Sequence, residues 1–286
     1  KKIRKQKLVD SSRRLQKLAN EINIMRFLSL ETEKSKYGIN PMGFFIQYHG
    51  VYQEDQTVCI LMDHIDLSAQ AKLLGCISPE LFDFNSKKHF SIMQVKFFAA
   101  QLAVTISYLH SHNIIHGDIK TENILIDRMG NIRLIDYDKA KINSVPEHED
   151  PRNCCFSELE GTPNYLAPEM LFPLLEQKEA KYGLAVDWWA YGVILVELSH
   201  NIPFTGKISD MRKQITDFRA EKYSRKIEPN TLNFISGFLV IDPLKRDWGK
   251  LGKNTITWRR TAEAQNFFGG MEWNKIFNLE YDSPFR

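Results

Sequence analysis

Apolar positions recur at helical spacing along much of the chain. Between residues 10 and 30 they fall at Leu15, Leu18, Ile22 and Met25, about one turn apart, and this period predicts a helix. The same kind of pattern predicts further helices at 67–76, 91–112, 186–199, 208–223 and 230–240. The second half of the chain is therefore expected to be mainly helical.

The first half also carries extended patterns. Two runs, 44–52 and 57–65, are separated by Gln53-Glu54-Asp55-Gln56, and this arrangement predicts a hairpin. Residues 114–142 alternate short apolar strands with polar loops, and residues 143–160 are polar and rich in helix breakers, as expected of a loop. We find no internal repeat.

Composition narrows the class of protein. The chain has 286 residues, 43% of them hydrophobic, which is enough for one large domain or two small lobes. Lys and Arg (38) exceed Asp and Glu (35) by only 3, too balanced for a dedicated nucleic-acid binder. We expect no transmembrane segment, on the view that no uncharged run approaches the roughly 18–20 residues that a span needs, and no signal peptide.

The cysteines indicate a reducing compartment. None of Cys59, Cys76, Cys154 and Cys155 forms a CxxC motif, and no Cys/His cluster has zinc-ligand spacing. Free thiols are the favoured interpretation. The chain also lacks an Asn-x-Ser/Thr glycosylation site. We expect a cytoplasmic or nuclear protein.

One polar segment has the residues that phosphoryl transfer requires. His116-Gly-Asp118-Ile-Lys120-Thr-Glu-Asn123 follows the predicted helix 91–112, and Asp136 comes thirteen residues after Asn123. The reaction needs a carboxylate to orient the attacking hydroxyl, a cation near the γ-phosphate, and oxygen ligands for Mg²⁺. Asp118, Lys120, Asn123 and Asp136 match these requirements in that order.

Further motifs follow in a fixed order: Gly161-Thr-Pro-Asn-Tyr-Leu-Ala-Pro-Glu169, Ala185-Val-Asp187-Trp-Trp-Ala-Tyr-Gly-Val, and Asp242-Pro-Leu-Lys-Arg246. Together they resemble the eukaryotic protein kinase family. The resemblance implies an α+β, bilobal protein kinase fold, with a small β-rich N-lobe containing the αC helix and a large, mainly helical C-lobe. It assigns residues 1–65 to the N-lobe, lacking its first strands, 66–265 to the C-lobe and 266–286 to the start of a C-terminal tail.

The resemblance implies ATP and Mg²⁺ as cofactors. Lys1, 20 residues before Glu21, would pair with that glutamate and hold the α- and β-phosphates. Lys2 is the alternative partner, and a solvated basic terminus is a further interpretation. Asn123 and Asp136 would hold the metal.

The resemblance also places the adenine site and an internal column of side chains. Met62 falls at the gatekeeper position, Asp63 to Ile65 at the hinge, and Leu125 under the adenine ring. Side chains matching the column that links the lobes, with Asp187 as its anchor, are Met25, Tyr48, His116 and Tyr137. For its apolar members, ordinary core packing is an equally good interpretation. Arg246 would pair with Glu169.

The chain departs from the family pattern at several positions. No Gly-x-Gly-x-x-Gly loop precedes Lys1, and Gly117 replaces the catalytic-loop arginine that pairs with a phosphorylated activation segment. The usual phosphorylation position holds Glu158, and Asp138 replaces the glycine of the metal motif. We therefore expect activity that does not depend on phosphorylation there.

Two apparent insertions, 148–156 and 172–181, are candidate docking surfaces for an unknown regulatory partner, or simply solvated loops.

Lys120 and Thr162 resemble the Ser/Thr class, and Ala185–Val193 with the C-terminal 266–286 resembles the AGC group of cyclic-nucleotide-dependent and C-type kinases. In basophilic members of that group, acids at the positions of Glu122 and Glu197 receive a substrate arginine. A further acid that the family has beside the hinge falls at Ala69 in this chain. That contact to arginine is therefore lost unless Asp66 substitutes. We expect protein substrates with Ser/Thr preceded by arginine.

Three functions remain open. The first is an active serine/threonine kinase in which Asp118 orients the substrate hydroxyl and accepts its proton. The second is a pseudokinase that serves as a binding or scaffolding module. The third is a kinase-fold enzyme acting on a small molecule, against which the peptide-docking segment 161–169 argues.

Overall fold

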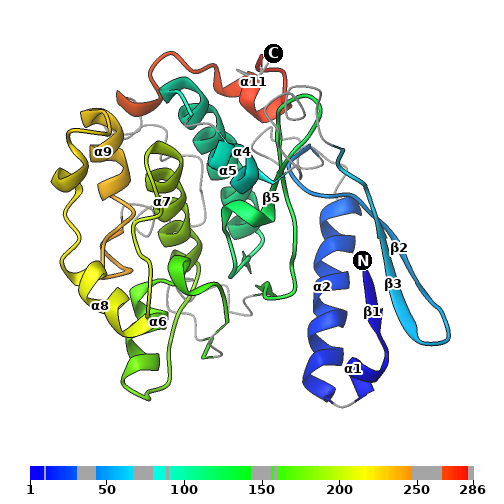
Figure 1. Cartoon of the computed structure of the whole chain (residues 1–286). Coiled ribbons are helices and arrows are strands. Elements are labelled where there is room, and N and C mark those ends of the chain that lie inside the picture. Colours follow the sequence, from blue (N-terminus) through cyan, green and yellow to red (C-terminus); the bar gives the residue numbers. More distant parts are fainter. Residues whose placement is uncertain are drawn as a thin grey trace.

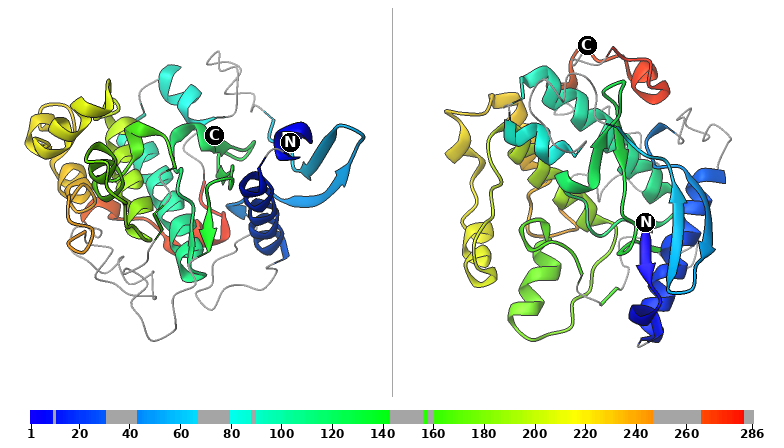
Figure 2. Two further views of the ribbon diagram at one scale, coloured as in Figure 1. Left: turned by 90° about the horizontal axis from the view of Figure 1, so that it is seen from below. Right: turned by 45° about the vertical axis from the view of Figure 1, so that its right-hand side comes forward.

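The computed structural model describes residues 1–9, 11–30, 43–66, 80–87, 90–142, 156–157, 160–246 and 266–282. These residues form two parts that stand side by side, a small sheet with a long helix and a larger, mainly helical part (Figure 1). Figure 2 shows the same separation from below, with the small part on the right. The predicted helix at 67–76, Ala69 and Glu158 lie outside the described residues.

The small lobe is built on a three-stranded antiparallel sheet in the order β1-β3-β2. Its strands are β1 (Lys2–Arg4), β2 (Tyr48–Gln53) and β3 (Thr57–Met62), and two helices, α1 (Gln6–Val9) and α2 (Ser12–Leu30), follow β1. The predicted hairpin is confirmed as β2 and β3, which pair in the register Val51↔Ile60 and Tyr52↔Cys59.

The first residues of the predicted hairpin strand have a different partner. Phe45 forms a bridge with Leu134 in the large lobe, and the Leu134 N–H donates to the Phe44 carbonyl at 2.9 Å. Phe44 and Phe45 are each 1% exposed. This apolar run therefore joins the two lobes, and the hairpin begins only at Tyr48.

Helix α2 confirms the helix predicted over 10–30. It buries Glu21, Ile24, Met25 and Leu28 on one face, at the spacing of helical turns. The other three are apolar, so Glu21 is the exception that needs a buried partner.

The large lobe is organised around α5 (Ile92–Ser111) and α7 (Ala185–Ser199), which pack against each other. A capping box begins α5: the Gln94 N–H donates to Ser91 Oγ, and the Ser91 N–H donates to the Gln94 side chain, which satisfies two otherwise unpaired donors. Further helices among the described residues of this lobe include α4 (Leu81–Lys87), α6 (Pro168–Leu175), α8 (Ile208–Thr216), α9 (Pro229–Ser236) and α11 (Trp273–Asn278).

Helix α5 corrects the expectation that no segment is long and apolar enough for a membrane span. It passes that test by length and composition, because no Asp, Glu, Lys or Arg occurs between Lys96 and Asp118. However, 83% of the relevant window is buried inside the protein. A helix that is apolar all round is also what a core helix requires, so the pattern by itself does not indicate a membrane.

Residues 114–142 form short paired strands, as predicted. Strand β4 (Ile114–Ile115) pairs with β7 (Lys141–Ile142), and β5 (Ile124–Ile126) pairs with β6 (Ile132–Leu134), both antiparallel. The loops between these strands carry most of the polar residues singled out above. The 3₁₀ turns of the described residues are η2 (Thr121–Asn123), η4 (Pro163–Tyr165) and η5 (Ala220–Tyr223).

In the second half, α7 matches the helix predicted over 186–199, whereas two predictions were too long. The run 208–223 divides into α8 and η5, because the Asp217 N–H closes α8 on the Lys213 carbonyl and the chain turns. The run 230–240 is helical only as far as Ser236. Apolar residues that are partly buried after α8 (Phe218) and buried after α9 (Phe238) continue past the helix ends, so periodicity could not mark these ends.

Candidate active site

Asp187, in the first turn of α7, holds the start of the polar loop between β4 and β5. Its carboxylate accepts the N–H groups of His116 (2.9 Å) and Gly117 (3.0 Å) and contacts His110 Nε2 at 2.8 Å. Burial alone would raise the pKa of Asp187, but these hydrogen bonds hold it below its ordinary value. A buried, ionised carboxylate thus fixes the backbone just before Asp118.

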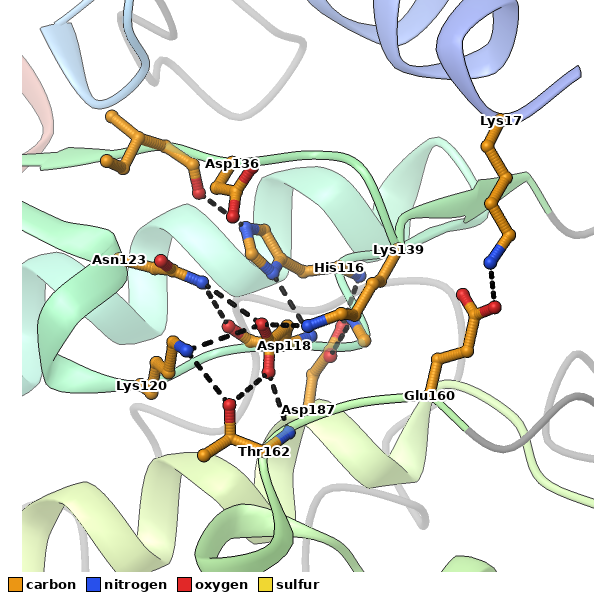
Figure 3. Close-up of polar contacts among 12 residues, drawn as sticks. Lys17, His116, Asp118, Lys120, Asn123, Asp136, Lys139, Glu160, Thr162 and Asp187 are labelled. Carbon is orange, nitrogen blue, oxygen red and sulfur yellow. Dashed lines mark hydrogen bonds and ion pairs between the residues drawn. The ribbon is translucent and has the colours of Figure 1, made fainter. Parts of the chain in front are cut away.

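Asp118 lies at the centre of the site, with its side chain only 2% exposed (Figure 3). Oδ1 accepts the N–H and the hydroxyl of Thr162, both at 2.9 Å. Oδ2 accepts Lys139 Nζ at 2.6 Å and Asn123 Nδ2 at 3.4 Å. Burial would raise the pKa of Asp118, but Lys139, Thr162 and Lys120 lower it overall, so the group is a carboxylate at neutral pH.

Lys120 and Asn123 flank Asp118, as the sequence indicated. Lys120 Nζ donates to Thr162 Oγ1 at 2.9 Å and lies 3.7 Å from Asp118 Oδ2. Asn123 is 5% exposed and donates Nδ2 to the Asp118 carbonyl at 2.8 Å. With its nitrogen directed to Asp118, the amide oxygen of Asn123 is the atom left to bind a cation.

Asp136 follows β6 and has a left-handed backbone, with φ 66°. Lys1 Nζ bridges the lobes, at 2.7 Å from Glu21 Oε1 and 3.2 Å from Asp136 Oδ1. Burial would lower the pKa of Lys1, but the two carboxylates raise it. Lys2 instead pairs with Glu54 on the exposed face of the sheet, at 3.3 Å. The structure thus brings Lys1 to Glu21 and Asp136 and leaves Lys2 outside the site.

The side chains of Asp136 and Asn123 have the chemistry that a Mg²⁺ site requires. Asp136 offers a carboxylate, and Asn123 offers an amide oxygen, the hard oxygen ligands that Mg²⁺ prefers. The described residues contain no cluster of three or more His, Cys, Asp or Glu that could hold a metal by themselves. Such a site needs ligands from a bound phosphate or from water, as is usual for Mg²⁺.

Two of the side chains predicted to form the internal column, His116 and Tyr137, lie against each other in the core. Tyr137 is 0% exposed, its hydroxyl donates to the Leu134 carbonyl at 3.0 Å, and its ring lies 5.3 Å from that of His116. Met25 is in the same core cluster, and Tyr48 packs against that cluster. The buried hydroxyl of Tyr137 therefore has a hydrogen-bond partner.

Unlike the Tyr137 hydroxyl, the carboxyl group of Asp138 has an oxygen without a hydrogen-bond partner among the described residues. This oxygen, Oδ1, is buried, and burial together with Asp136 raises the pKa of the carboxyl group. It adds negative charge beside the predicted metal site.

The predicted hinge follows β3. Met62 ends that strand, and the Asp63 N–H donates to the Gln47 carbonyl at 3.0 Å. This N–H is therefore engaged within the protein, and adenine would have to be bound by other backbone groups of Asp63–Ile65. Leu125 lies on β5 opposite Arg133 and is half-buried.

The two acids expected to receive arginine are Glu197 and Glu122. Glu197 is 5% exposed and accepts the Tyr165 hydroxyl at 2.8 Å and the Thr121 hydroxyl at 3.1 Å. Burial raises its pKa to about 7. Glu122 is half-buried next to Thr121.

Glu80 is an acid that sequence reasoning missed. It forms a bridge with Leu125, and burial together with the nearby Glu122 and Asp83 raises its pKa. Asp66, considered as a hinge-side acid, is instead paired with Arg128 and His64. No local motif marks Glu80, because only the fold brings it beside Glu122.

The activation segment, residues 136–169, contacts helix α2 through Glu160, a second residue that the sequence analysis did not identify. Its carboxylate pairs with Lys17, shown at the right of Figure 3, and lies 3.5 Å from Arg13. Four residues before Glu160, Phe156 pairs with Tyr182 as a β-bridge. The rest of the apparent insertion 148–156 lies outside the described residues.

The predicted pairing of Arg246 with Glu169 is present. Both guanidinium nitrogens lie 2.6 Å from the Glu169 oxygens, and Arg246 is 0% exposed. The guanidinium also donates to the Ala185 carbonyl at 3.0 Å and lies 5.1 Å from the ring centre of Trp189. It therefore ties α6 to the start of α7, below the catalytic loop.

Comparisons with known proteins agree with this arrangement. Residues 1–247 match the protein kinase domain family. The chain is 28% identical over 245 residues to a RAC serine/threonine-protein kinase of Drosophila melanogaster, covering 85% of this chain and 36% of that protein. It is 30% identical over 245 residues to a cAMP-dependent protein kinase catalytic subunit of Arthrobotrys oligospora (85% and 41%), and 29% identical to the serine/threonine-protein kinase sgk-1 of Caenorhabditis elegans (85% and 46%).

The chain spans less than half the length of these relatives. They are serine/threonine kinases of the AGC type, as the motifs predicted. The small sheet-containing lobe and the mainly helical large lobe confirm the predicted fold class, and the chain belongs to the protein kinase family.

Proposed function

We propose that this chain is the catalytic domain of an active serine/threonine protein kinase that transfers the γ-phosphate of ATP to protein hydroxyls. The observation that carries the proposal is the ion pair of Lys1 with Glu21 and Asp136. It joins the small lobe to the large lobe at the point where the phosphates of ATP would lie, close to the catalytic loop.

The residues have distinct tasks in this proposal. Asp118, ionised and held by Thr162, orients the substrate hydroxyl and accepts its proton. Lys120 neutralises charge on the transferred phosphoryl group, and Lys1 holds the α- and β-phosphates. Mg²⁺, when held by Asn123 and Asp136, would neutralise phosphate charge. Catalysis then rests on positioning and electrostatics rather than on covalent chemistry.

A preference for arginine before the phosphorylated residue is part of the proposal. The carboxylates of Glu80, Glu122 and Glu197 gather on one side of the catalytic loop. Like charges raise one another's pKa values, so an arginine bound among them would relieve repulsion and form charge-assisted hydrogen bonds. Arginine suits such a site better than lysine because its planar group can bind two carboxylates.

We also propose that activity does not require phosphorylation of the activation segment. Glu160 provides a permanent negative charge that already binds Lys17 and Arg13 on α2. Because α2 also carries Glu21, this contact connects the segment to the Lys1 pair. Gly117 offers no arginine to a phosphate at that point of the catalytic loop.

The alternative is a pseudokinase, and one observation favours it. Both oxygens of Asp118 accept hydrogen bonds from the protein itself, so a substrate hydroxyl must displace or share a donor. Transfer is the property that separates the two functions.

The deciding experiment measures transfer of labelled γ-phosphate from Mg²⁺-ATP to a Ser/Thr peptide library, using the natural full-length protein. Asp118→Asn, which keeps the size of the side chain, is the control. We expect transfer to arginine-containing peptides that is lost in the control. A folded protein with no transfer above the control would support the pseudokinase, and transfer with no arginine preference would refute the assigned specificity alone.

A further inference from the structure

Among the described residues, Lys139 makes the shortest contact to the Asp118 carboxylate. Its Nζ lies 2.6 Å from Oδ2, whereas Lys120 Nζ lies 3.7 Å from the same atom. Figure 3 shows Lys139 reaching Asp118 from the segment that follows Asp136, opposite Lys120 and Thr162. The Lys139 side chain is 26% exposed and that of Asp118 is 2% exposed, so this ion pair is largely shielded from water.

The backbone geometry around Gly117 lets Lys139 take this position. Gly117 has φ 75°, and a Cβ atom there would lie 3.0 Å from the Lys139 carbonyl oxygen. A side chain at position 117 would therefore crowd the Lys139 backbone. On the other side, Asn20 of α2 donates to the Ala140 carbonyl at 2.6 Å. The segment is thus held between the catalytic loop and α2.

We propose that Lys139 is a positioning residue of the phosphoryl transfer, which fixes the Asp118 carboxylate. This inference rests on the proposed kinase activity. Lys139 extends from the segment that follows Asp136, a residue proposed to hold the metal. The same segment therefore orients the Asp118 carboxylate and places Asp136.

The charges around Asp118 support a specific role for Lys139. The cations facing its carboxylate are Lys139 and Lys120, the neighbouring carboxylate is Asp138, and the uncharged donors are Thr162 and Asn123. Burying a charged group is costly unless it is paired and hydrogen-bonded. Lys120 also binds Thr162, so Lys139 is the cation in direct contact with Oδ2.

The test compares the natural full-length protein with Lys139→Met, Lys139→Arg and Lys141→Met. Methionine keeps much of the lysine volume without its charge. Lys141→Met removes the same charge from the same segment, but Lys141 Nζ contacts the Tyr182 hydroxyl at 2.9 Å instead of Asp118. Two properties are measured: kcat and KM, each determined separately for ATP and for the peptide, and the carboxyl chemical shift of Asp118 at pH 7 by carbon NMR of ¹³C-labelled aspartate, assigned with Asp118→Asn.

We expect Lys139→Met to move the carboxyl chemical shift of Asp118 and to lower kcat by about tenfold or more, with KM for ATP little changed. Lys139→Arg should restore most of the activity, and Lys141→Met should leave the chemical shift of Asp118 unchanged. Thermal melting confirms that each variant is folded.

Two results would overturn the inference. One is an unchanged chemical shift of Asp118 together with an unchanged kcat in Lys139→Met. The other is a higher kcat in that variant, which would make the pair an inhibitory contact. Absence of transfer in the unmodified protein is a different result, because it refutes the kinase proposal, while the NMR spectra still decide whether Lys139 contacts the Asp118 carboxylate.

Discussion

At the scale of single residues, the site depends on which of two adjacent lysines turns inward. Lys1 and Lys2 have the same chemistry, and consecutive side chains of a strand point to opposite faces. Lys1 reaches Glu21 and Asp136, and Lys2 reaches Glu54. This difference can be tested directly, because Lys2 serves as the matched control.

We predict that Lys1→Met reduces phosphate transfer by about 100-fold or more, since removing one preorganised charge from a buried site has effects of this size. Lys2→Met should change transfer less than about twofold, because its ion pair is exposed. Steady-state kinetics with Mg²⁺-ATP and an arginine-containing peptide provide the measurement. Equal losses in both variants would show that Lys1 has no special role.

Glu197 makes a second prediction at this scale, about pH. Its folded pKa of about 7 exceeds the ordinary value of about 4.5, so between these values the folded state binds more protons than the unfolded state. The free energy of unfolding contributed by this group therefore falls as pH rises from about 4.5 to about 7. The full effect is on the order of 3 kcal/mol.

Glu197→Gln cannot titrate and should lose this dependence. The stability of the variant relative to the unmodified protein should therefore improve between pH 5 and pH 8, as measured by urea denaturation at both values. Using the difference between the two proteins cancels the other titrating groups. If the difference is the same at both pH values, Glu197 titrates normally.

At the scale of elements, α2 is the connecting piece. Its face toward the site carries Glu21, bound to Lys1, and its first half carries Arg13 and Lys17, bound to Glu160. A rigid helix transmits the position of one contact to the other. The activation segment can thus influence the Lys1 pair without touching it.

We predict that Glu160→Lys lowers transfer by about tenfold, the effect of losing about 1.4 kcal/mol of a partly buried ion pair. The double variant Lys17→Glu/Glu160→Lys should recover part of that loss, because it restores opposite charges across the same gap. Glu176→Lys, at an exposed ion pair with Lys178 and Arg212, is the control and should remain active. If the double variant recovers no activity, the contact of Glu160 with Lys17 does not control the position of α2.

At the scale of the whole molecule, the large lobe forms the rigid base of the site. Helices α5 and α7 pack together, Asp187 on α7 holds the catalytic loop, and Arg246 ties α7 to α6. The small lobe packs on this base through a shared core cluster that includes Met25 and Phe44, and through contacts such as Leu134 with Phe44 and Lys1 with Asp136. The site therefore lies between two lobes that this core joins.

We predict that Arg246→Met lowers the free energy of unfolding by about 3–5 kcal/mol, because it leaves the Glu169 carboxylate without its partner. The double variant Arg246→Met/Glu169→Leu should be less destabilised, since no unpaired charge remains. Arg212→Met removes an ion pair with a half-exposed side chain and should cost less than about 1 kcal/mol. Urea denaturation measures all three, and a small loss in Arg246→Met would show that the pair is dispensable.

The sequence by itself determined the family, the two-part α+β fold and the residues in order along the catalytic loop, because phosphoryl transfer needs particular side chains at short, recognisable spacings. It also indicated helices such as α2 and α7, whose apolar residues follow the helical period over several turns. The predicted helix ends were less accurate where buried or partly buried apolar residues continue beyond the helix, as after α8 and α9.

Only the tertiary structure decided which long-range partners meet. The choice of Lys1, the contact of Lys139 with Asp118, the approach of Glu80 to Glu122 and the binding of Glu160 by α2 all join residues from separate elements. Such contacts depend on how elements pack, and isolated charged residues leave no periodic signal in the sequence. The same packing buried the apolar helix α5 in the core, which its composition could not distinguish from a membrane span.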